Sequence, residues 1–238
     1  MLLRANGIRD GELAAQPSPI ALTRRALHPV KTPELPQVVD PRCALLRDPT
    51  SPTARTYRLL RHQLLARSDP RVIVVTSALK GEGKTTCAIN LALCIADETF
   101  ARVLLLEANR QRPSLARVFG VPTLHDGGSD LATTSRHRVL GSSGPRLHIA
   151  SALAYATHCG GLDRALFGGA LHELREVYDY IVVDTASVLE SADVDVAAEC
   201  AGGVIVAARA GRSRRGPLER AIAQLSPANV CGVVLLDI

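Results

Sequence analysis

The sequence predicts an α/β domain with a doubly wound, mostly parallel β-sheet, on the basis of three observations. Short apolar runs rich in β-branched residues recur from residue 71 onward, as expected of strands covered on both faces. Segments with helical periodicity lie between these runs, and this alternation is typical of parallel strands joined by crossover helices. A glycine-containing turn joins the first run to the helical segment that follows it.

The individual elements follow from these patterns in chain order. Tyr57, Leu60 and Leu64 recur at helical spacing and predict an amphipathic helix before the first strand. We expect strands at residues 71–77, 102–108, 146–152, 178–186, 202–210 and 229–238. We expect helices at residues 53–67, 84–98, 162–177, 191–201 and 217–225. No internal repeat of solenoid length accompanies this series.

The N-terminal part of the chain differs in composition from the rest. Residues 17–42 contain repeated prolines, which interrupt helices and central strands. We therefore expect a flexible, proline-rich arm at residues 1–52 and a single folded domain at residues 53–238. A linker or a docking segment is the natural role of such an arm.

Composition excludes several classes of protein. The chain has 238 residues, of which 47% are hydrophobic and 21% charged, as in ordinary soluble domains. Its net charge of +5 suits an anionic ligand, a membrane surface or simple solubility equally well. Aromatic residues make up only 3% and tryptophan is absent, so stacking platforms for nucleic-acid bases are not expected. We expect no nucleic-acid partner.

Cysteine spacing and hydropathy indicate the compartment. The six cysteines form no C-x-x-C pair, so we expect buried, reduced thiols rather than a metal site. No apolar run reaches the roughly 18 residues of a membrane-spanning helix, so the sequence predicts no transmembrane segment of its own. The apolar start of the chain is too short for a signal peptide, and we expect a cytoplasmic protein.

The turn at residues 78–86, Ala-Leu-Lys-Gly-Glu-Gly-Lys-Thr-Thr, has the pattern of a phosphate-binding loop with alanine in place of the first glycine. Gly81 and Gly83 allow successive backbone N–H groups to point at phosphate oxygens. Lys84 offers an ammonium to the β- and γ-phosphates, and the Thr85 hydroxyl is suited to bind Mg²⁺. We assign nucleotide binding to Lys80, Gly81, Glu82, Gly83, Lys84, Thr85 and Thr86.

The position of this turn decides between a phosphate loop and an ordinary turn with a solvated lysine. An apolar strand precedes it and a helix follows it, which is the context that a phosphate loop requires. Asp184 ends the strand at residues 178–186, at the sheet edge where ligands of parallel α/β sheets bind. Asp184 together with Thr85 would hold Mg²⁺, and the expected ligand is ATP with Mg²⁺.

These motifs resemble the cytoplasmic domain of bacterial tyrosine kinases (BY-kinases) of the capsule and exopolysaccharide chain-length type, within the MinD/ParA-like P-loop ATPases. The resemblance runs from about residue 53 to the C-terminus. It includes the Gly-Glu-Gly-Lys core at residues 81–84. The segment VLLLEANRQRPSL is similar to the second family motif, Walker A′. YDYIVVDTAS resembles the Walker B segment, and Arg58 and Arg61 match an oligomerisation motif in which Arg55 replaces a glutamate.

The resemblance also implies catalytic roles. Lys84, Glu107 and Asp184 stand at the positions that carry phosphoryl transfer in the family. Glu107 and Asn109 replace two aspartates of Walker A′, and Asn109 cannot carry the negative charge of a base. The four tyrosines lie at residues 57, 155, 178 and 180, so we expect no autophosphorylation on a terminal tyrosine cluster.

The partners that the resemblance implies are a membrane-embedded polysaccharide co-polymerase and further copies of the chain, because BY-kinases form homo-oligomers. It therefore implies recruitment to the inner face of the cell membrane.

Three functions remain open at this stage. The first is a regulator of exopolysaccharide or capsule polymerisation and export, with or without tyrosine kinase activity. The second is a MinD/ParA-like dimeric ATPase for positioning or partitioning, which Lys80 favours by its similarity to a signature lysine. The third is a non-catalytic nucleotide-binding regulator, which Asn109 favours.

A basic run follows the strand at residues 202–210 and comprises Arg209, Arg212, Arg214 and Arg215. It could contact the nucleotide, an acidic partner or anionic lipid, or it could be a solvated loop.

Overall fold

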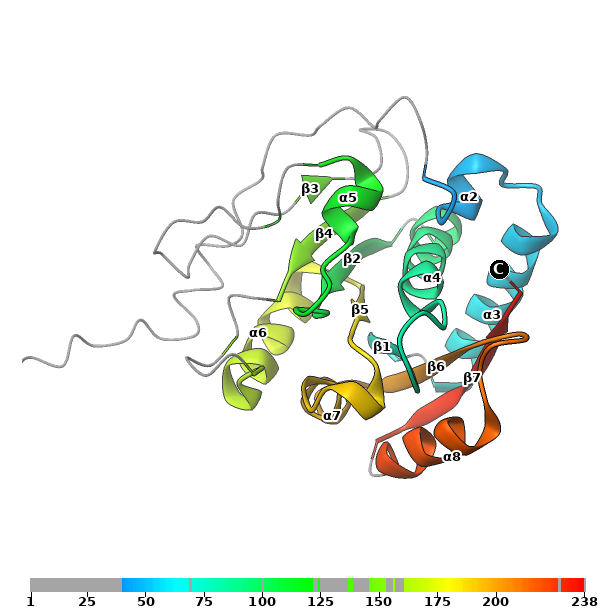
Figure 1. The fold of residues 1–238 in the computed structure, drawn as a ribbon. Helices are drawn as coiled ribbons and strands as arrows, with labels where there is room; N and C mark the ends of the chain where they lie inside the picture. The colour runs from blue at the N-terminus through cyan, green and yellow to red at the C-terminus, as the bar shows by residue number, and fades with distance from the viewer. Residues whose placement is uncertain are drawn as a thin grey trace, which may run out of the picture.

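The computed structural model describes residues 40–68, 70–99, 101–121, 124, 137–138, 146–152, 156, 161–226 and 228–237. Within them lies a seven-stranded sheet with the strand order β3-β4-β2-β5-β1-β6-β7 (Figure 1). The strands are β1 (Val72–Ser77), β2 (Arg102–Glu107), β3 (His137–Arg138), β4 (Arg146–Ser151), β5 (Tyr180–Asp184), β6 (Gly203–Arg209) and β7 (Val230–Leu236). Neighbouring strands are parallel except for the antiparallel pair β3–β4. The prediction of a doubly wound, mostly parallel sheet is confirmed.

Helices cover both faces of the sheet (Figure 1). They are α2 (Ala44–Arg47), α3 (Pro52–Ser68), α4 (Lys84–Thr99), α5 (Leu115–Phe119), α6 (Arg164–Val177), the 3₁₀ helix η2 (Val188–Glu190), α7 (Asp193–Glu199) and α8 (Arg215–Gln224). One core cluster joins the first four of these helices to one face, and a second cluster joins α6, α7 and α8 to the other.

The alternation of side chains along each strand produces these two cores. All six residues of β1 are buried; Ile73 and Val75 belong to the α4 side, and Val72 and Val74 to the α6 side. Because both faces are covered, the first four residues of the strand are all apolar, and the buried polar residues Thr76 and Ser77 stand only at its end. The same alternation decides which residues at the strand ends face α4.

The six predicted strands and five predicted helices are all present, with ends that differ from the predictions by a few residues. Short elements were not predicted, namely α2, α5, η2 and β3. The five residues of α5 and the four of α2 are too few for helical periodicity to be recognised in a sequence. Their stability comes from tertiary contacts, since isolated short helices are unstable in water.

Residues 1–39 lie outside the described residues, so for them the flexible arm predicted at residues 1–52 stays a prediction. The end of that segment is described, and it packs on the domain. Cys43 and Leu45 are buried in the same core as α3 and α4. The predicted boundary at residue 52 therefore falls just after a segment that contributes to the core.

Asn90, a completely buried residue of α4, holds the segment before α3 against α4 through hydrogen bonds. Its amide oxygen accepts a hydrogen bond from the N–H of Leu45 at 3.3 Å, and its amide nitrogen donates to the carbonyl of Arg42 at 2.6 Å. The same nitrogen donates to the carbonyl of Thr86 at 2.8 Å, one turn earlier in α4. One buried side chain thus satisfies backbone groups on two segments that are 45 residues apart.

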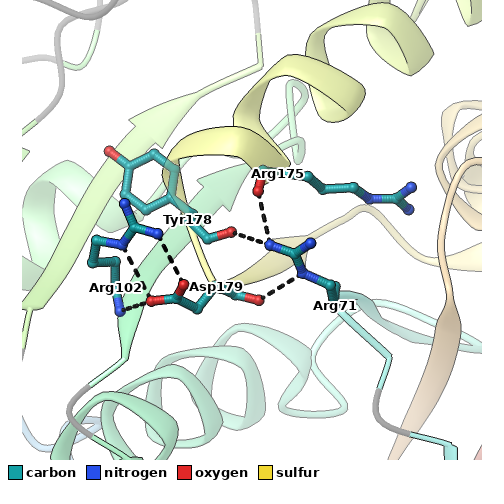
Figure 2. A network of polar contacts seen from close by, with 5 residues as sticks. All are labelled: Arg71, Arg102, Arg175, Tyr178 and Asp179. Atoms are coloured by element: carbon teal, nitrogen blue, oxygen red, sulfur yellow. Dashed lines mark hydrogen bonds and ion pairs between the residues drawn. The ribbon is translucent and has the colours of Figure 1, made fainter.

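A network of polar contacts lies at the edge of the sheet where β1, β2 and β5 begin (Figure 2). The guanidinium of Arg71 donates to the carbonyls of Arg175 at 2.8 Å and Tyr178 at 3.2 Å, at the end of α6. Arg102 pairs with Asp179 at 2.9 Å, and this pairing holds the pKa of the Asp179 carboxyl below its usual range. Because Arg102 and Asp179 are 45% and 41% exposed, the pair orders the strand starts more than it stabilises the fold.

The cysteine prediction concerns six residues, of which Cys159 lies outside the described part. The other five form no disulfide; Cys43, Cys87 and Cys94 are buried, and Cys200 and Cys231 are half-buried. Burial raises the pKa of Cys87 to about 12, so its thiol is unreactive at neutral pH. Within the described residues no group of three or more His, Cys, Asp or Glu side chains could hold a metal ion.

Replacing Asn90 with alanine is expected to lower the free energy of unfolding by about 1–3 kcal/mol, because the buried Leu45 N–H loses its partner. Urea denaturation followed by circular dichroism measures this loss. Asn229 is the control, because it is exposed and makes one hydrogen bond to the carbonyl of Gly202 at 2.8 Å. Its alanine variant should change stability by less than about 0.5 kcal/mol; equal losses in both variants would contradict a special role for Asn90.

Candidate nucleotide-binding site

The phosphate loop lies between β1 and α4, where the sequence predicts it. Gly81 and Gly83 have φ values of 78° and 93°, in the region that favours glycine. Helix α4 begins at Lys84, and its first main-chain bond runs from the N–H of Cys87 to the carbonyl of Gly83 at 2.9 Å. The N–H groups before Cys87 need partners outside the helix, so this turn is suited to bind an anion.

The buried side chain of Glu82 stabilises the conformation of the phosphate loop through hydrogen bonds. Its side chain is almost fully buried, and Oε2 accepts a hydrogen bond from the N–H of Leu79 at 2.8 Å. Its Oε1 accepts a hydrogen bond from the hydroxyl of Ser213 at 2.5 Å. Ser213 follows β6, so the loop is tied to the next strand of the sheet. Glu82 was predicted to bind nucleotide, but the structure shows its carboxylate engaged with the protein.

Asp184 lies at the end of β5, directly beside the start of α4. Its Oδ2 accepts a hydrogen bond from the Thr85 hydroxyl at 2.8 Å, whereas Oδ1 is buried without a partner among the described residues. Complete burial raises the pKa of Asp184 to about 7; the Thr85 hydroxyl and the charge of Lys84 oppose this shift, and the charge of Glu107 adds to it. The two residues predicted to bind Mg²⁺ are therefore in contact.

The other predicted loop residues are distributed around this centre. Lys84 is buried, with 8% of its surface exposed, and is close enough to Asp184 to influence its pKa. Lys80 is exposed at the tip of the turn, whereas Thr86 is half-buried at the third position of α4. Lys84 thus belongs to the polar centre, and Lys80 does not.

Glu107 ends β2 and pairs in register with Asp184 on the neighbouring strand. Residues paired in this way direct their side chains to the same face, so both carboxyl groups lie on the α4 side. Oε1 of Glu107 accepts hydrogen bonds from the N–H of Ser114 and from the N–H of Leu115 at 3.1 Å, which caps α5. Burial raises the pKa of Glu107, and these two N–H groups oppose the shift.

This capping role was not predicted for Glu107, and it changes the chemistry available. The two main-chain hydrogen bonds occupy Oε1 and favour the ionised form, which opposes the rise in pKa that burial causes. Asn109, two residues further on, is buried and neutral. The end of β2 thus supplies one engaged carboxylate and one buried amide.

The residues of this edge fit ATP with Mg²⁺. The unpaired Asp184 Oδ1 and the Thr85 hydroxyl are hard oxygen donors, which Mg²⁺ prefers and which usually act together with phosphate oxygens and water. The glycine turn, the start of α4 and Lys84 would hold the phosphates. A bound cation would also favour the ionised form of Asp184, which burial disfavours in its absence.

Comparison with known proteins identifies the chain's relatives. Tyrosine-protein kinase CpsD of Streptococcus agalactiae serotype III (strain NEM316) is 26% identical over 175 residues, which cover 69% of this chain and 73% of the relative. Putative tyrosine-protein kinase EpsB of Ralstonia solanacearum is 32% identical over 194 residues, covering 77% of this chain and 25% of the relative. The chain is a homologue of the bacterial tyrosine kinases. No family model matches the sequence.

A third relative is named for the biosynthesis and transport of succinoglycan. The succinoglycan biosynthesis transport protein ExoP of Rhizobium meliloti (strain 1021) is 29% identical over 178 residues, covering 69% of this chain and 22% of the relative. The homologous region is therefore only about a quarter of ExoP and EpsB, and most of CpsD. In the described part of this chain, no helix is long and apolar enough to cross a membrane.

Solved structures show the same fold. The kinase domain of VpsO has a TM-score of 0.60 and 27% identity, covering 78% of this chain and 95% of that domain. The kinase domain of the Escherichia coli tyrosine kinase ETK has a TM-score of 0.68 at 21% identity, covering 85% and 82%. MinD in the MinC:MinD complex of Aquifex aeolicus has a TM-score of 0.53 at 22% identity, covering 69% and 68%. The chain has the P-loop fold that these kinases and ATPases share.

The raised pKa of Asp184 predicts how the stability of the nucleotide-free protein depends on pH. Because the folded-state pKa of about 7 exceeds the ordinary value of 3.8, the folded protein binds the proton more tightly than the unfolded chain. Asp184 should therefore contribute favourably below about pH 4 and lose this contribution as pH rises to about 7. Asp184→Asn removes the titration and keeps an acceptor for Thr85.

Thermal unfolding at pH 5 and pH 8, without Mg²⁺ or nucleotide, tests this expectation. The gain in stability from Asp184→Asn should be larger at pH 8 than at pH 5, by about 1–3 kcal/mol. Asp195→Asn is a suitable control, because Asp195 lies in α7 and bonds the amide of Gln224 at 2.9 Å. An Asp184→Asn effect that is the same at both pH values would show that Asp184 does not titrate in this range.

Proposed function

We propose that the chain binds ATP with Mg²⁺ at its phosphate loop and regulates exopolysaccharide or capsule polymerisation and export. The observation that carries the proposal is the contact of Thr85 with Asp184 beside the glycine turn, with one buried oxygen of Asp184 unpaired. Phosphates at the turn and a cation at this oxygen would satisfy groups that the protein leaves open. The homology with CpsD, EpsB and ExoP supports the pathway.

The role of each residue follows from its position. Lys84 and the main-chain N–H groups of the Gly81–Gly83 turn would bind phosphates, and Thr85 with Asp184 would hold Mg²⁺. ATP with Mg²⁺ would supply the phosphoryl group in any transfer reaction. Glu107 is the remaining carboxylate that could accept a proton from an attacking hydroxyl, provided that it leaves the α5 cap.

We further propose that the chain acts at the inner face of the cell membrane through a membrane-embedded polysaccharide co-polymerase. Nucleotide binding would set its oligomeric state and, through that state, the activity of the partner. The position of Arg58 and Arg61 in α3 supports a homo-oligomer by resemblance alone. Within the chain, Arg58 already donates to the carbonyl of Pro49 at 2.7 Å.

Binding and transfer are tested with γ-labelled ATP and Mg²⁺, comparing the natural chain with Lys84→Ala. The natural chain should retain ATP, and the variant should bind it at least about tenfold more weakly, because a charge-assisted contact is lost. Label on the protein above the Lys84→Ala background would establish a kinase, and free phosphate alone would establish an ATPase. Failure of the natural chain to bind ATP would reject the proposed function.

A non-catalytic nucleotide-dependent regulator is the second candidate, and the neutral Asn109 beside the engaged Glu107 favours it. This candidate predicts ATP binding without transfer or hydrolysis. Asn109→Asp restores the carboxylate that the family resemblance implies and should raise phosphate release at least about tenfold if Asn109 limits the reaction. Glu107→Gln is the matched variant, because it keeps the acceptor for the α5 cap and removes the charge.

Each outcome of this comparison is informative. Activity in the natural chain that disappears in Glu107→Gln would make Glu107 the base and would contradict the non-catalytic candidate. Activity that appears only in Asn109→Asp would support that candidate. Turnover in the natural chain that neither substitution changes would contradict both the limiting role of Asn109 and the assignment of Glu107 as base.

A further inference from the structure

One arginine of the basic run lies against the phosphate loop. A Cβ atom built at Gly81 would stand 2.9 Å from Nη2 and 3.0 Å from Cζ of Arg212. The guanidinium therefore occupies the side of Gly81 from which a side chain is missing. The three atoms nearest to this position all belong to the guanidinium of Arg212. The glycine thus serves two purposes, since it also has the positive φ that the turn requires.

A tight turn after β6 holds Arg212 in this position. The Ser213 hydroxyl accepts a hydrogen bond from the N–H of Arg209 at 2.8 Å and donates to Oε1 of Glu82 at 2.5 Å. The N–H of Ser213 also donates to the carbonyl of Arg209 at 2.9 Å. Because Glu82 belongs to the phosphate loop, this serine joins the turn that carries Arg212 to the loop that Arg212 contacts.

The charges around the loop are unbalanced. Lys84 and the start of α4 are positive, and the Glu82 carboxylate is already engaged by Leu79 and Ser213. Within the described residues, Arg212 has no carboxylate oxygen at ion-pair distance, whereas Arg215 pairs with Glu219 at 2.7 Å. The Arg212 guanidinium is positive, and the main-chain N–H groups of the loop carry partial positive charge. An anion bound between them is therefore attracted by both.

We infer that Arg212 is a phosphate-binding residue of this site, placed by the Ser213–Glu82 hydrogen bond. The inference rests on the proposed function, since it assigns Arg212 to the nucleotide that the phosphate loop would bind. The guanidinium suits the task because its planar fork can donate two parallel hydrogen bonds to phosphate oxygens. An exposed arginine on an adjacent strand connection thereby supplies a second cation to the same anion as Lys84.

The test measures ATP binding to the full chain in the presence of Mg²⁺ by isothermal titration calorimetry. Arg212→Ala should weaken binding about tenfold or more, and Arg212→Lys should recover only part of this loss. Arg214→Ala is the control, because it removes the same charge from an exposed residue two positions away, none of whose atoms is among the three nearest to a Cβ at Gly81. Thermal unfolding without nucleotide should be unchanged in all three variants.

The outcomes separate this inference from the proposed function. ATP binding by Arg212→Ala within twofold of the natural chain would overturn the role of Arg212 and leave the proposed function intact. An equal loss in Arg214→Ala would reduce the effect to overall charge and would also overturn it. Absence of ATP binding by the natural chain would reject both.

The positioning of Arg212 has its own test. Ser213→Ala removes the hydroxyl that reaches Glu82, and it should weaken ATP binding about threefold or more. Ser213→Thr keeps a hydroxyl and should bind within twofold of the natural chain. Unchanged binding by Ser213→Ala, with thermal unfolding also unchanged, would show that the Ser213–Glu82 bond does not place Arg212.

Discussion

The burial of the Asp184 carboxyl group beside the start of α4 is the constraint on which the site depends. Complete burial disfavours its charge, and the Thr85 hydroxyl and the charge of Lys84 recover only part of the lost hydration. The strand order places Asp184 between the glycine turn and Glu107. Strand β5 lies between β1, which leads into the glycine turn, and β2, which ends in Glu107. A site that is unfavourable for an isolated carboxylate becomes favourable once a cation and an anion are both bound.

The sequence predicted those parts of the fold and site that depend on local patterns. The glycine turn, Lys84 and Thr85 are contiguous, and Asp184 ends an apolar strand, so the rule that ligands bind at the carboxyl ends of parallel strands located it. The capping of α5 by Glu107 and the bond from Ser213 to Glu82 depend on packing between segments 7 and 131 residues apart. No periodicity in the sequence encodes such contacts, and the basic run alone did not distinguish Arg212 from its neighbours.

The Walker A′ segment illustrates how a small chemical change alters a site. Glu107 is one methylene longer than aspartate and reaches the N–H groups at the start of α5, which stabilises that short helix. The carboxylate then serves the local structure, because its Oε1 accepts hydrogen bonds from the main chain of α5. With Asn109 neutral, the edge contains less negative charge than the family resemblance implies. Lower negative charge weakens repulsion of a polyphosphate, so the proposed site would favour nucleotide binding more than phosphoryl transfer.

The same edge also explains how bound nucleotide could affect distant surfaces. The phosphate loop connects through Glu82 and Ser213 to the turn before α8, and through the carbonyl of Ala78, which accepts from the N–H of Leu189 at 3.3 Å, to η2. Asn90 connects the first turns of α4 to the segment before α3. A ligand bound at the loop would therefore be connected to the turn before α8, to η2 and, through α4, to the segment before α3. A regulator that acts through nucleotide binding alone requires contacts that link the phosphate site to the protein surface. Phosphoryl transfer at the site does not require such contacts.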